Sequence, residues 1–348
     1  MIWALQPPNF LLLSCLYNKV KERPLVEKNV KKRLNERPLV TYILLCYKQA
    51  QYILAAVQSA LEQDYDNIEF ILSDDQSPDN SFDLIKAEVE KRGMTDKVIL
   101  NRNENNLGLV PHLNKLLRMA KGEIIVLAAG DDISLPHRVK RTVELLVDPE
   151  ISFVSFNDEV IDAKGDTTRK GTRVNYDGVK VFSIDEYIAG QRIPFSGASR
   201  GFRRSTYDFF GDLNMDCPTE DTPYIIRGLL LGKTAISSEI AIKYRVHGEN
   251  LSGPKYLPYM DISNITKQYH ADSNYALSEN KIDSTLHSKL SEWININNNK
   301  RVNTNLRQKL SNTNFEFGFL FQNILTSNCF SVREKLGLFK LCVYQIFS

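Results

Sequence analysis

Buried, β-branched runs alternate with helix-length segments over residues 38–156. The run LVTYILLC over residues 39–46 is apolar almost throughout, which is typical of a strand buried on both faces of a sheet. Strands joined by helices in this way form right-handed βαβ units around a mainly parallel sheet. The sequence therefore predicts an α/β fold, with a doubly wound sheet flanked by helices.

The expected elements define three parts of the chain. We expect strands over residues 39–46, 68–73, 98–100, 123–127 and 151–156, and helices over residues 51–63, 81–92, 110–120 and from Pro136. A basic extension over residues 1–37 comes before this domain, which spans residues 38–255 and has halves at 38–156 and 157–255. Residues 256–348 form a helical appendage, with Asn-rich breaks expected over residues 294–304.

Acidic residues follow two of the expected strands. Asp131 and Asp132 leave the strand over residues 123–127, and ligands of such sheets bind beyond the carboxyl ends of the strands. Adjacent carboxylates repel each other unless a hard cation such as Mg²⁺ or Mn²⁺, shared with a diphosphate, neutralises them. The alternative is that one of them caps the helix that begins near Pro136.

The loops after the first two strands offer groups for a nucleotide. Asp74 or Asp75 can accept hydrogen bonds from a base or ribose, and Tyr47 can stack on a base. An Asx turn followed by capping of the helix at Ser81 explains the aspartates equally well. A lone tyrosine at this point more often belongs to the core.

Two further pairs lie in the second half. Glu220 and Asp221 precede a short amphipathic segment over residues 222–232, so Asp221 is either an N-cap or a general base. Arg245 and His247 fall on one face of a strand end and could both meet a diphosphate or metal. A purely structural histidine is the alternative.

Composition excludes several classes of protein. Lys+Arg 44 against Asp+Glu 42 gives a net charge of +2, too balanced for a general nucleic-acid-binding surface. Five dispersed cysteines without a CxxC motif argue against a disulfide framework or a cysteine zinc site, and fit a reducing, cytoplasmic location. The apolar stretch over residues 10–16 is too short to span a bilayer, and it reads as a short packed helix.

In order and spacing, these residues resemble the motifs of glycosyltransferase family 2, the inverting enzymes of GT-A type. The matching positions are Tyr47, residues 73–77 with Asp79, Asn106, Gly108, Asn114, residues 120–123, Asp131, Asp132, Glu220, Asp221, residues 244–247, Asn250 and Ser252. Ala129 replaces the first aspartate of the family's Asp-x-Asp-Asp motif, and Cys46 replaces a threonine. The resemblance covers residues 38–252.

The resemblance implies a GT-A fold and transfer of a sugar from a nucleoside-diphosphate donor, mostly uridine-based in this family, to an acceptor hydroxyl. It assigns donor binding to Tyr47, Asp74, Asp75, Asn106, Gly108, Asn114 and Arg245. It implies Mn²⁺ or Mg²⁺ at Asp131, with Asp132 and His247 assisting. Asp221, within the catalytic Glu220–Asp221 pair, would take the proton from the acceptor hydroxyl.

The resemblance also bears on the acceptor, which it implies is a saccharide or a polyprenyl-linked saccharide of bacterial surface-polysaccharide assembly. The small residues of the segment over residues 197–204 would admit a sugar, and Arg203 and Arg204 are either anion contacts or plain surface arginines. The basic, amphipathic segment over residues 332–347 is compatible with a helix lying on an anionic membrane. Such a stripe more often packs on its own domain, or on a second subunit in a homo-oligomer.

Three other functions compete with this one. A sugar nucleotidyltransferase has a similar sheet but needs a glycine-rich phosphate loop after the first strand, where residues 47–51 have no glycine. A receiver-like phosphoacceptor module also gathers acidic residues at strand ends, but it is too short to reach Asp221. The third is a catalytically impaired relative kept as an assembly partner, which the substitution at Ala129 favours.

Overall fold

The computed structural model describes residues 37–171, 173–253, 255–256 and 260–310, together with residues 333, 335–337 and 340. The chain divides into two units, Met1–Pro38 and Leu39–Ser348. The sheet and the helices below belong to the second unit. The expected basic extension over residues 1–37 and the expected helix over residues 332–347 lie almost wholly outside the described residues.

The first half of the sheet is parallel, as the sequence predicts. Its strands are β1 (Val40–Cys46), β2 (Ile68–Asp74), β3 (Val98–Arg102) and β4 (Ile124–Ala129), in the order β3-β2-β1-β4. β1 pairs in parallel with β2 on one side and β4 on the other, so that Leu44 lies opposite Leu72 and Ala128. The connecting helices are α3 (Ile53–Leu61), α4 (Ser81–Lys91) and α5 (Leu109–Met119). This arrangement places the ends of β1, β2 and β4 at one edge.

The second half of the sheet is mixed. β9 (Gly201–Arg203) lies antiparallel between β4 and β6 (Ile151–Ile161), and β10 (Lys233–Arg245) runs parallel to β6. Short antiparallel strands complete it: β5 (Ile133–Ser134), β7 (Thr167–Lys170) and β8 (Val179–Phe182). β6 is longer than the expected strand over residues 151–156, because the polar sequence NDE over residues 157–159 is buried inside the sheet.

Alternation along β1 assigns its side chains to two hydrophobic layers. Tyr42 and Leu44 pack with α3, α4 and α6 (Arg138–Leu146), whereas Ile43 joins the layer of α5 and α9 (Asp221–Leu231) on the opposite face. Successive side chains of a strand point to opposite faces, so both faces of this strand must be apolar. Both are covered by helices, which explains the continuous apolar run in the sequence.

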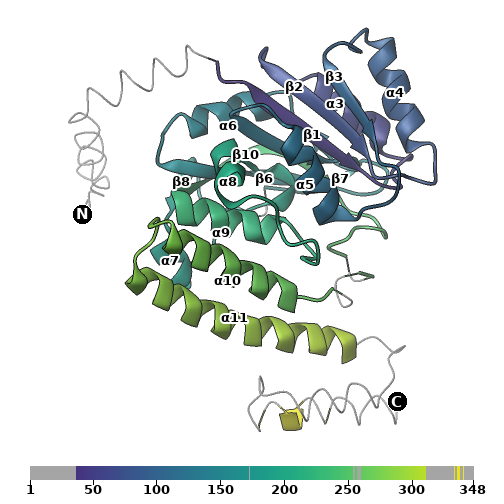
Figure 1. Cartoon of the computed structure of the whole chain (residues 1–348). Coiled ribbons are helices and arrows are strands. Elements are labelled where there is room, and N and C mark those ends of the chain that lie inside the picture. The colour runs from purple at the N-terminus through teal and green to yellow at the C-terminus, as the bar shows by residue number, and fades with distance from the viewer. Residues whose placement is uncertain are drawn as a thin grey trace, which may run out of the picture. The chain divides into compact units, whose positions relative to one another are not determined.

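Helices extend the second layer away from the sheet. α10 (Ser263–Ser278) packs against α9 and α11 (Ser284–Leu310), and the three lie side by side in Figure 1. The expected breaks over residues 294–304 are wrong, since α11 continues through them. Asparagine only weakly disfavours a helix, and packing of Leu290 and Ile294 in the core outweighs that preference. Within the described residues, no helix combines the length and the apolar character needed to cross a membrane.

The remaining short elements connect β8 to α9. They are α7 (Ile184–Ile188), the 3₁₀ turn η1 (Gly197–Ser199) and α8 (Arg204–Phe210). α7 begins with a capping box in which the Ser183 hydroxyl and the Glu186 carboxylate bind each other's backbone N–H groups. η1 contacts β4, β6 and β10, which brings its backbone to the same edge of the sheet as the predicted site residues.

Candidate active site

A cavity of about 1970 Å³ opens at the edge where β1, β4, β6 and β10 end. It is lined by residues far apart in the chain, and the lining includes both Asp131 and Asp221. Of the predicted site residues it also includes Tyr47, Asp75, Asn106, Gly108, Asp132, Glu220 and His247. Asp74, Asn114 and Arg245 are not among the residues that line it.

One end of the cavity is formed around Asp75. Its Oδ1 accepts from Asn103 Nδ2 at 2.7 Å and from the Leu107 N–H at 2.9 Å, and its Oδ2 accepts from the Gly108 N–H at 2.9 Å. Gly108 has φ of 83°, a left-handed conformation that favours glycine. The carboxylate therefore holds the 107–108 loop against the end of β2, and the loop forms this wall of the cavity.

Tyr47 and Asn106 complete this end. The ring of Tyr47 is 40% exposed, with the Lys48 ammonium 5.2 Å from its centre, so it is a surface ring and not part of the core. The Asn106 side chain accepts from the Gly108 N–H at 3.0 Å. An exposed aromatic face beside a cation can receive a flat ring such as a nucleobase.

Asp74 is buried beneath this wall. Its Oδ1 accepts from the Ser77 N–H at 2.8 Å, which closes the turn after β2, and its Oδ2 has no partner among the described residues. Asp79 then holds the start of α4 by accepting from the Ser81 N–H at 3.1 Å. The turn after β2 agrees with the turn weighed as the alternative, whereas the N-cap of α4, Asn80, has no side-chain cap bond. Asp74 does not line the cavity, and its expected contact with the donor stays a prediction.

Asn114 also does not line the cavity. Its Nδ2 donates to the Leu213 carbonyl at 2.7 Å, and its Oδ1 accepts from the Leu213 N–H at 3.0 Å. Both polar groups of the amide are thus used to tie α5 to the chain after α8. The amide thus has a packing role in the structure, and its expected part in donor binding stays a prediction.

Asp131 and Asp132 follow β4 and lie at the cavity wall. Asp131 Oδ2 accepts from His247 Nε2 at 3.0 Å, a direction set by the Glu249 N–H, which donates to His247 Nδ1 at 3.2 Å. Asp132 Oδ1 accepts from the Arg245 N–H at 2.8 Å. Neither aspartate caps α6, whose N-cap is His137, so the capping alternative is wrong.

Burial, followed by the charge of Asp131, raises the pKa of Asp132 well above its ordinary value. Two buried adjacent carboxylates form the donor set that Mg²⁺ or Mn²⁺ uses when substrate phosphates and water complete its coordination. No three His, Cys, Asp or Glu side chains in the described part of the chain cluster as a metal site. Asp131 and Asp132 therefore fit a cation that is shared with a ligand.

Arg245 supports this pair from outside the cavity. Its Nε donates to the Asp131 carbonyl at 2.8 Å, and its Nη1 donates to the carbonyls of Asp162 and Ala163 at 3.1 and 3.3 Å. The guanidinium lies 4.8 Å from the centre of the Tyr52 ring. Two of its nitrogens are thus bound to backbone carbonyls and the residue does not line the cavity, so the expected contact of Arg245 with a diphosphate stays a prediction.

Asp221 is the first residue of α9. Its Oδ1 accepts from Thr219 Oγ1 and from the Thr222 N–H, both at 2.6 Å, and its Oδ2 lies beside Gly197 of η1. Glu220 occupies the N-cap position without a side-chain cap bond, so the interpretation of Asp221 as an N-cap is wrong. Asp221 is thus a cavity-lining carboxylate with one oxygen fixed and the other near a glycine.

Glu220, unlike Asp221, forms an ion pair among the described residues. Its carboxylate forms a buried ion pair with Arg200, whose guanidinium also donates to the Gly197 carbonyl. Of these two adjacent acids, only Glu220 forms an ion pair among the described residues, and Asp221 is left to face the cavity without one.

The sequence-family comparison decides the class of this domain. Residues 41–210 match the model of Glycosyl transferase family 2, just under half of the chain. These residues form a family 2 glycosyltransferase domain. The match favours a glycosyltransferase over the receiver and nucleotidyltransferase alternatives. It ends before Glu220, Asp221 and His247.

Curated relatives agree with the assignment. An uncharacterized glycosyltransferase of Nostoc is 27% identical over 61% of this chain and 66% of its own length. A putative glycosyltransferase, EpsE, of Bacillus subtilis is 33% identical over 32% of this chain and 40% of its length. The Escherichia coli enzyme WfaP, named as a UDP-Glc:α-D-GlcNAc-diphosphoundecaprenol β-1,3-glucosyltransferase, is 31% identical over 36% of this chain and 47% of its length. The chain thus spans less than two thirds of the length of these relatives.

Solved structures show the same fold. TarS 1–349 of S. aureus in complex with UDP has a TM-score of 0.58 at 13% identity, over 82% of this chain and 78% of that one. The mannosyltransferase PcManGT of Pyrobaculum calidifontis, in complex with GDP-Man and Mn²⁺, has a TM-score of 0.52 at 15% identity over 92% of each chain. The predicted GT-A-like fold is confirmed.

Arg203 and Arg204, which the sequence offered as anion contacts, do not line the cavity. Arg203 donates to the carbonyls of Ile151 at 2.8 Å and Asp148 at 2.8 Å, and Arg204 pairs with Asp208 on the surface. The interpretation of these arginines as anion contacts is therefore wrong. The small residue at Gly197 instead makes room for Asp221.

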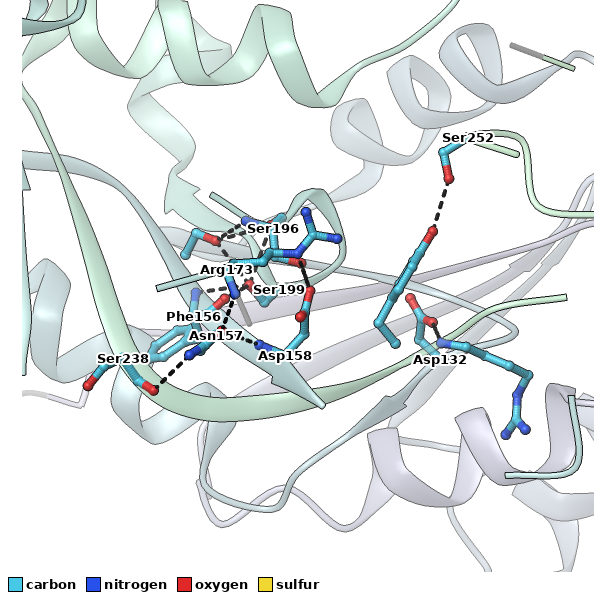
Figure 2. A network of polar contacts seen from close by, with 12 residues as sticks. Asp132, Phe156, Asn157, Asp158, Arg173, Ser196, Ser199, Ser238 and Ser252 are labelled. Atoms are coloured by element: carbon cyan, nitrogen blue, oxygen red, sulfur yellow. Dashed lines mark hydrogen bonds and ion pairs between the residues drawn. The ribbon is translucent and has the colours of Figure 1, made fainter. Parts of the chain in front are cut away.

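A buried polar network beside η1 has no counterpart in the sequence motifs. Asp158, within β6, accepts from Ser196 Oγ at 3.0 Å and from Arg173, and its other oxygen has no partner among the described residues (Figure 2). The Ser199 hydroxyl holds the backbone N–H of Phe156 at 2.9 Å. Asp158 lines the cavity but lies in a strand core, where the sequence offers no signal for a functional acid.

Proposed function

We propose that this chain transfers a sugar from a nucleoside-diphosphate donor, a UDP-sugar, to a hydroxyl of a saccharide or lipid-linked saccharide, with inversion at the anomeric carbon. The observation that carries the proposal is that Asp131 and Asp132, within the residues that match family 2, line the same cavity as Asp221, which lies beyond the match. These residues are far apart in the sequence, and only the fold brings them to one cavity.

The donor end lies between the ends of β1 and β2. The ring of Tyr47 provides a face for the base, and the 107–108 loop, held by Asp75, provides backbone groups along the nucleoside. The relatives support the choice of donor: TarS 1–349 has been crystallised with UDP and with UDP-GlcNAc, and WfaP is named as a UDP-Glc-dependent enzyme.

Asp131 and Asp132 would hold Mn²⁺ or Mg²⁺ together with the donor diphosphate. A bound divalent cation there would stabilise the negative charge that develops on the leaving nucleoside diphosphate. His247 orients Asp131 through its Nε2–H, and the Arg245 backbone N–H orients Asp132. The presence of Mn²⁺ in the PcManGT complex supports this choice of cofactor.

Asp221 would act as the general base. Its Oδ1 is fixed by two donors from Thr219 and Thr222, which leaves Oδ2 as the atom that takes the acceptor's proton. A single carboxylate suffices for inversion, because the acceptor oxygen attacks the anomeric carbon directly and no glycosyl-enzyme intermediate forms. Glu220 would keep Arg200 in place beside it.

A catalytically impaired assembly partner is the second candidate, and one observation favours it. Ala129 stands at the end of β4 where the family has the first aspartate of its motif, so the metal site has one carboxylate fewer. The two candidates differ in turnover: an impaired relative would bind the nucleotide and release none from a nucleotide-sugar.

Binding and turnover test the proposal together. Calorimetry should show that Mn²⁺ promotes UDP binding, and that Asp131→Ala abolishes this dependence while exposed Asp208→Asn does not. Asp221→Asn should bind UDP within a few fold of the unaltered protein and lose UDP release from UDP-sugars in the presence of acceptor. Absence of nucleotide binding would refute the proposed function, and retained turnover in Asp221→Asn would remove that residue from the base role.

A further inference from the structure

One histidine that lines the cavity has no part in the proposed chemistry. His112 lies in the first turn of α5 and is 2% exposed, and its Nε2 lies 2.6 Å from Ser73 Oγ near the end of β2. The second ring nitrogen, Nδ1, has no hydrogen-bond partner among the described residues and is not sealed off from solvent. Because the residue lines the cavity, this nitrogen is free to contact a bound ligand.

A chain of hydrogen bonds fixes which groups donate and which accept beside this ring. The Lys115 ammonium can only donate, so the Asn103 atom that it contacts at 2.7 Å is Oδ1. Asn103 Nδ2 therefore donates to Asp75 Oδ1 at 2.7 Å. Asn101 Nδ2 donates both to the same Asn103 Oδ1 at 3.0 Å and to Ser73 Oγ at 2.8 Å. Lys115 thus sets the direction of the bonds as far as Ser73.

The same chain assigns the proton of the imidazole. The buried Ser73 hydroxyl already accepts from Asn101, and the described acceptor that is left for its own proton is His112 Nε2. Buried hydroxyl groups are hydrogen-bonded as a rule, so Ser73 donates and Nε2 accepts. Burial lowers the pKa of His112 to about 4, so the ring is neutral near pH 7. Its single proton then lies on Nδ1, the nitrogen that is open to the cavity.

Asp75 supplies an acceptor at the same end of the cavity. A carboxylate offers about four sites for hydrogen bonds, and Asp75 uses three of them, for Asn103, Leu107 and Gly108. The site that remains is on Oδ2, which accepts only from Gly108 among the described residues. Burial outweighs the opposing effect of the Asp75 charge on the pKa of His112, and that effect requires the two side chains to lie near each other. This end of the cavity therefore combines a neutral N–H donor with an anionic acceptor.

Such a pair of groups distinguishes the edges of the two pyrimidine bases. Uracil presents a ring N–H beside a carbonyl oxygen, whereas cytosine presents a ring nitrogen acceptor beside an amino donor. A donor and an acceptor fixed in the protein match the first edge and oppose the second at both positions. A site whose buried polar groups are left unpaired by the wrong ligand discriminates more strongly than one that loses only apolar contact.

We infer that His112 selects the donor base: its Nδ1–H binds a carbonyl oxygen of uracil, while Asp75 accepts from the adjacent ring N–H. The inference rests on the proposed function, and it deepens that function by naming the groups that distinguish a UDP-sugar from a CDP-sugar. Ser73 and Asn101 act on the base only through His112, as positioning residues. Stacking on Tyr47 and a cation-bound diphosphate are open to both nucleotides, so neither makes this choice.

Calorimetry on the full chain with Mn²⁺ tests the inference with UDP and CDP, which differ only at this edge of the base. The unaltered protein should bind UDP at least tenfold more tightly than CDP. His112→Gln keeps an amide oxygen that can accept from Ser73 but removes the Nδ1–H, so it should weaken UDP about tenfold and should not weaken CDP. His112→Asn, with an amide N–H near the position of Nδ1, should restore part of the preference. His287→Gln is the matched control, because this histidine of α11 bonds to Asn274 and does not line the cavity.

Nuclear magnetic resonance of the ¹⁵N-labelled histidines tests the position of the proton. The signals that disappear in His112→Gln should show a neutral ring with its proton on Nδ1 near pH 7, and UDP should shift the Nδ1 signal more than CDP does. Ser73→Ala removes the hydroxyl that sets this tautomer, so it should reduce the preference for UDP without weakening CDP. A purely structural role of His112 would leave the preference for UDP unchanged in both variants.

Three results would overturn the inference. Equal affinities of the unaltered protein for UDP and CDP would show that no selection occurs at this edge. Equal losses of UDP and CDP affinity in a His112→Gln protein that thermal unfolding shows to be folded would assign the residue to the ribose or to packing. A proton on Nε2 in the nucleotide-free protein would contradict the hydrogen-bond network. Failure of both nucleotides to bind would instead refute the proposed function, and the spectra would still establish the tautomer.

Discussion

A single methyl group at Gly197 should displace the proposed base. A Cβ added at this position would lie 2.7 Å from Asp221 Oδ2, 3.1 Å from its Cβ and 3.3 Å from its Cγ, whereas ordinary contact begins at 3.4 Å. Oδ2 must therefore move by about 0.7 Å, or the turn η1 must shift by a similar distance. Gly197 does not have a positive φ, so the substitution tests the contact and not backbone strain.

The size of the effect follows from this displacement. Asp221 cannot rotate freely away from the methyl group, because Thr219 and Thr222 hold its Oδ1. A misplacement that approaches 1 Å costs a catalytic group up to about a hundredfold in rate, which corresponds to about 2.7 kcal/mol of transition-state stabilisation. We expect Gly197→Ala to lose about this factor in kcat while the KM for the donor stays within a few fold.

The assay is UDP release from a UDP-sugar with and without acceptor, together with thermal unfolding of the same samples. Gly248→Ala is the control, since its added Cβ would meet nothing within 4 Å and its φ is not positive. Wild-type turnover in a folded Gly197→Ala protein would contradict the reasoning, as would an equal loss of donor affinity. Either result would show that the position of Asp221 beside Gly197 does not control proton removal.

Two further substitutions test the charges of the fold. Because burial raises the pKa of Asp132, the folded state binds its proton more tightly than the unfolded state and loses stability as pH rises through that range. Asp132→Asn should therefore raise the Tm of the metal-free protein at pH 8, and this gain in Tm should shrink toward acidic pH. The same substitution should abolish Mn²⁺-dependent UDP binding. A Tm difference that does not depend on pH would contradict this reasoning. Asp272→Ala leaves Arg227 buried without its bidentate partner at 2.9 Å and should cost about 3–5 kcal/mol in denaturant unfolding, against at most about 1 kcal/mol for exposed Asp208→Ala. Equal losses in these two variants would show that the buried pair does not hold α10 to α9.

The parallel half of the domain could be predicted closely from the sequence. The expected strand over residues 39–46 and the observed β1 differ by one residue, and α4 differs from its expected range by one residue. These elements are encoded locally, because burial on both faces requires a continuous apolar run and a one-sided helix requires a 3.6-residue period. β6 departs from this pattern because its buried Asn157 and Asp158 read as the end of a strand.

The candidate site was predictable only in part. Local motifs named Asp75, Asp131 and Asp221, and all three line the cavity. Asp75 and Asp131 follow parallel strands, whose ends meet at one edge, whereas Asp221 begins α9 and reaches the cavity through tertiary packing. The motifs did not separate Asp75 from Asp74, although the two are adjacent. Successive side chains along an extended chain point to opposite sides, so Asp74 and Asp75 cannot both face the cavity. The packing of the 107–108 loop against Asp75 decides which of the two does.

Composition, periodicity and motif order by themselves determined the α/β class, the first four strands and the set of acids from which a site could be built. The tertiary structure alone decided which groups the polar side chains bind. Asn114 binds a backbone group that lies 99 residues further along the chain, and Arg245 is enclosed by carbonyls more than 80 residues before it. A side chain's function depends on which of its atoms remain unpaired after folding, and long-range contacts that no local pattern encodes determine that.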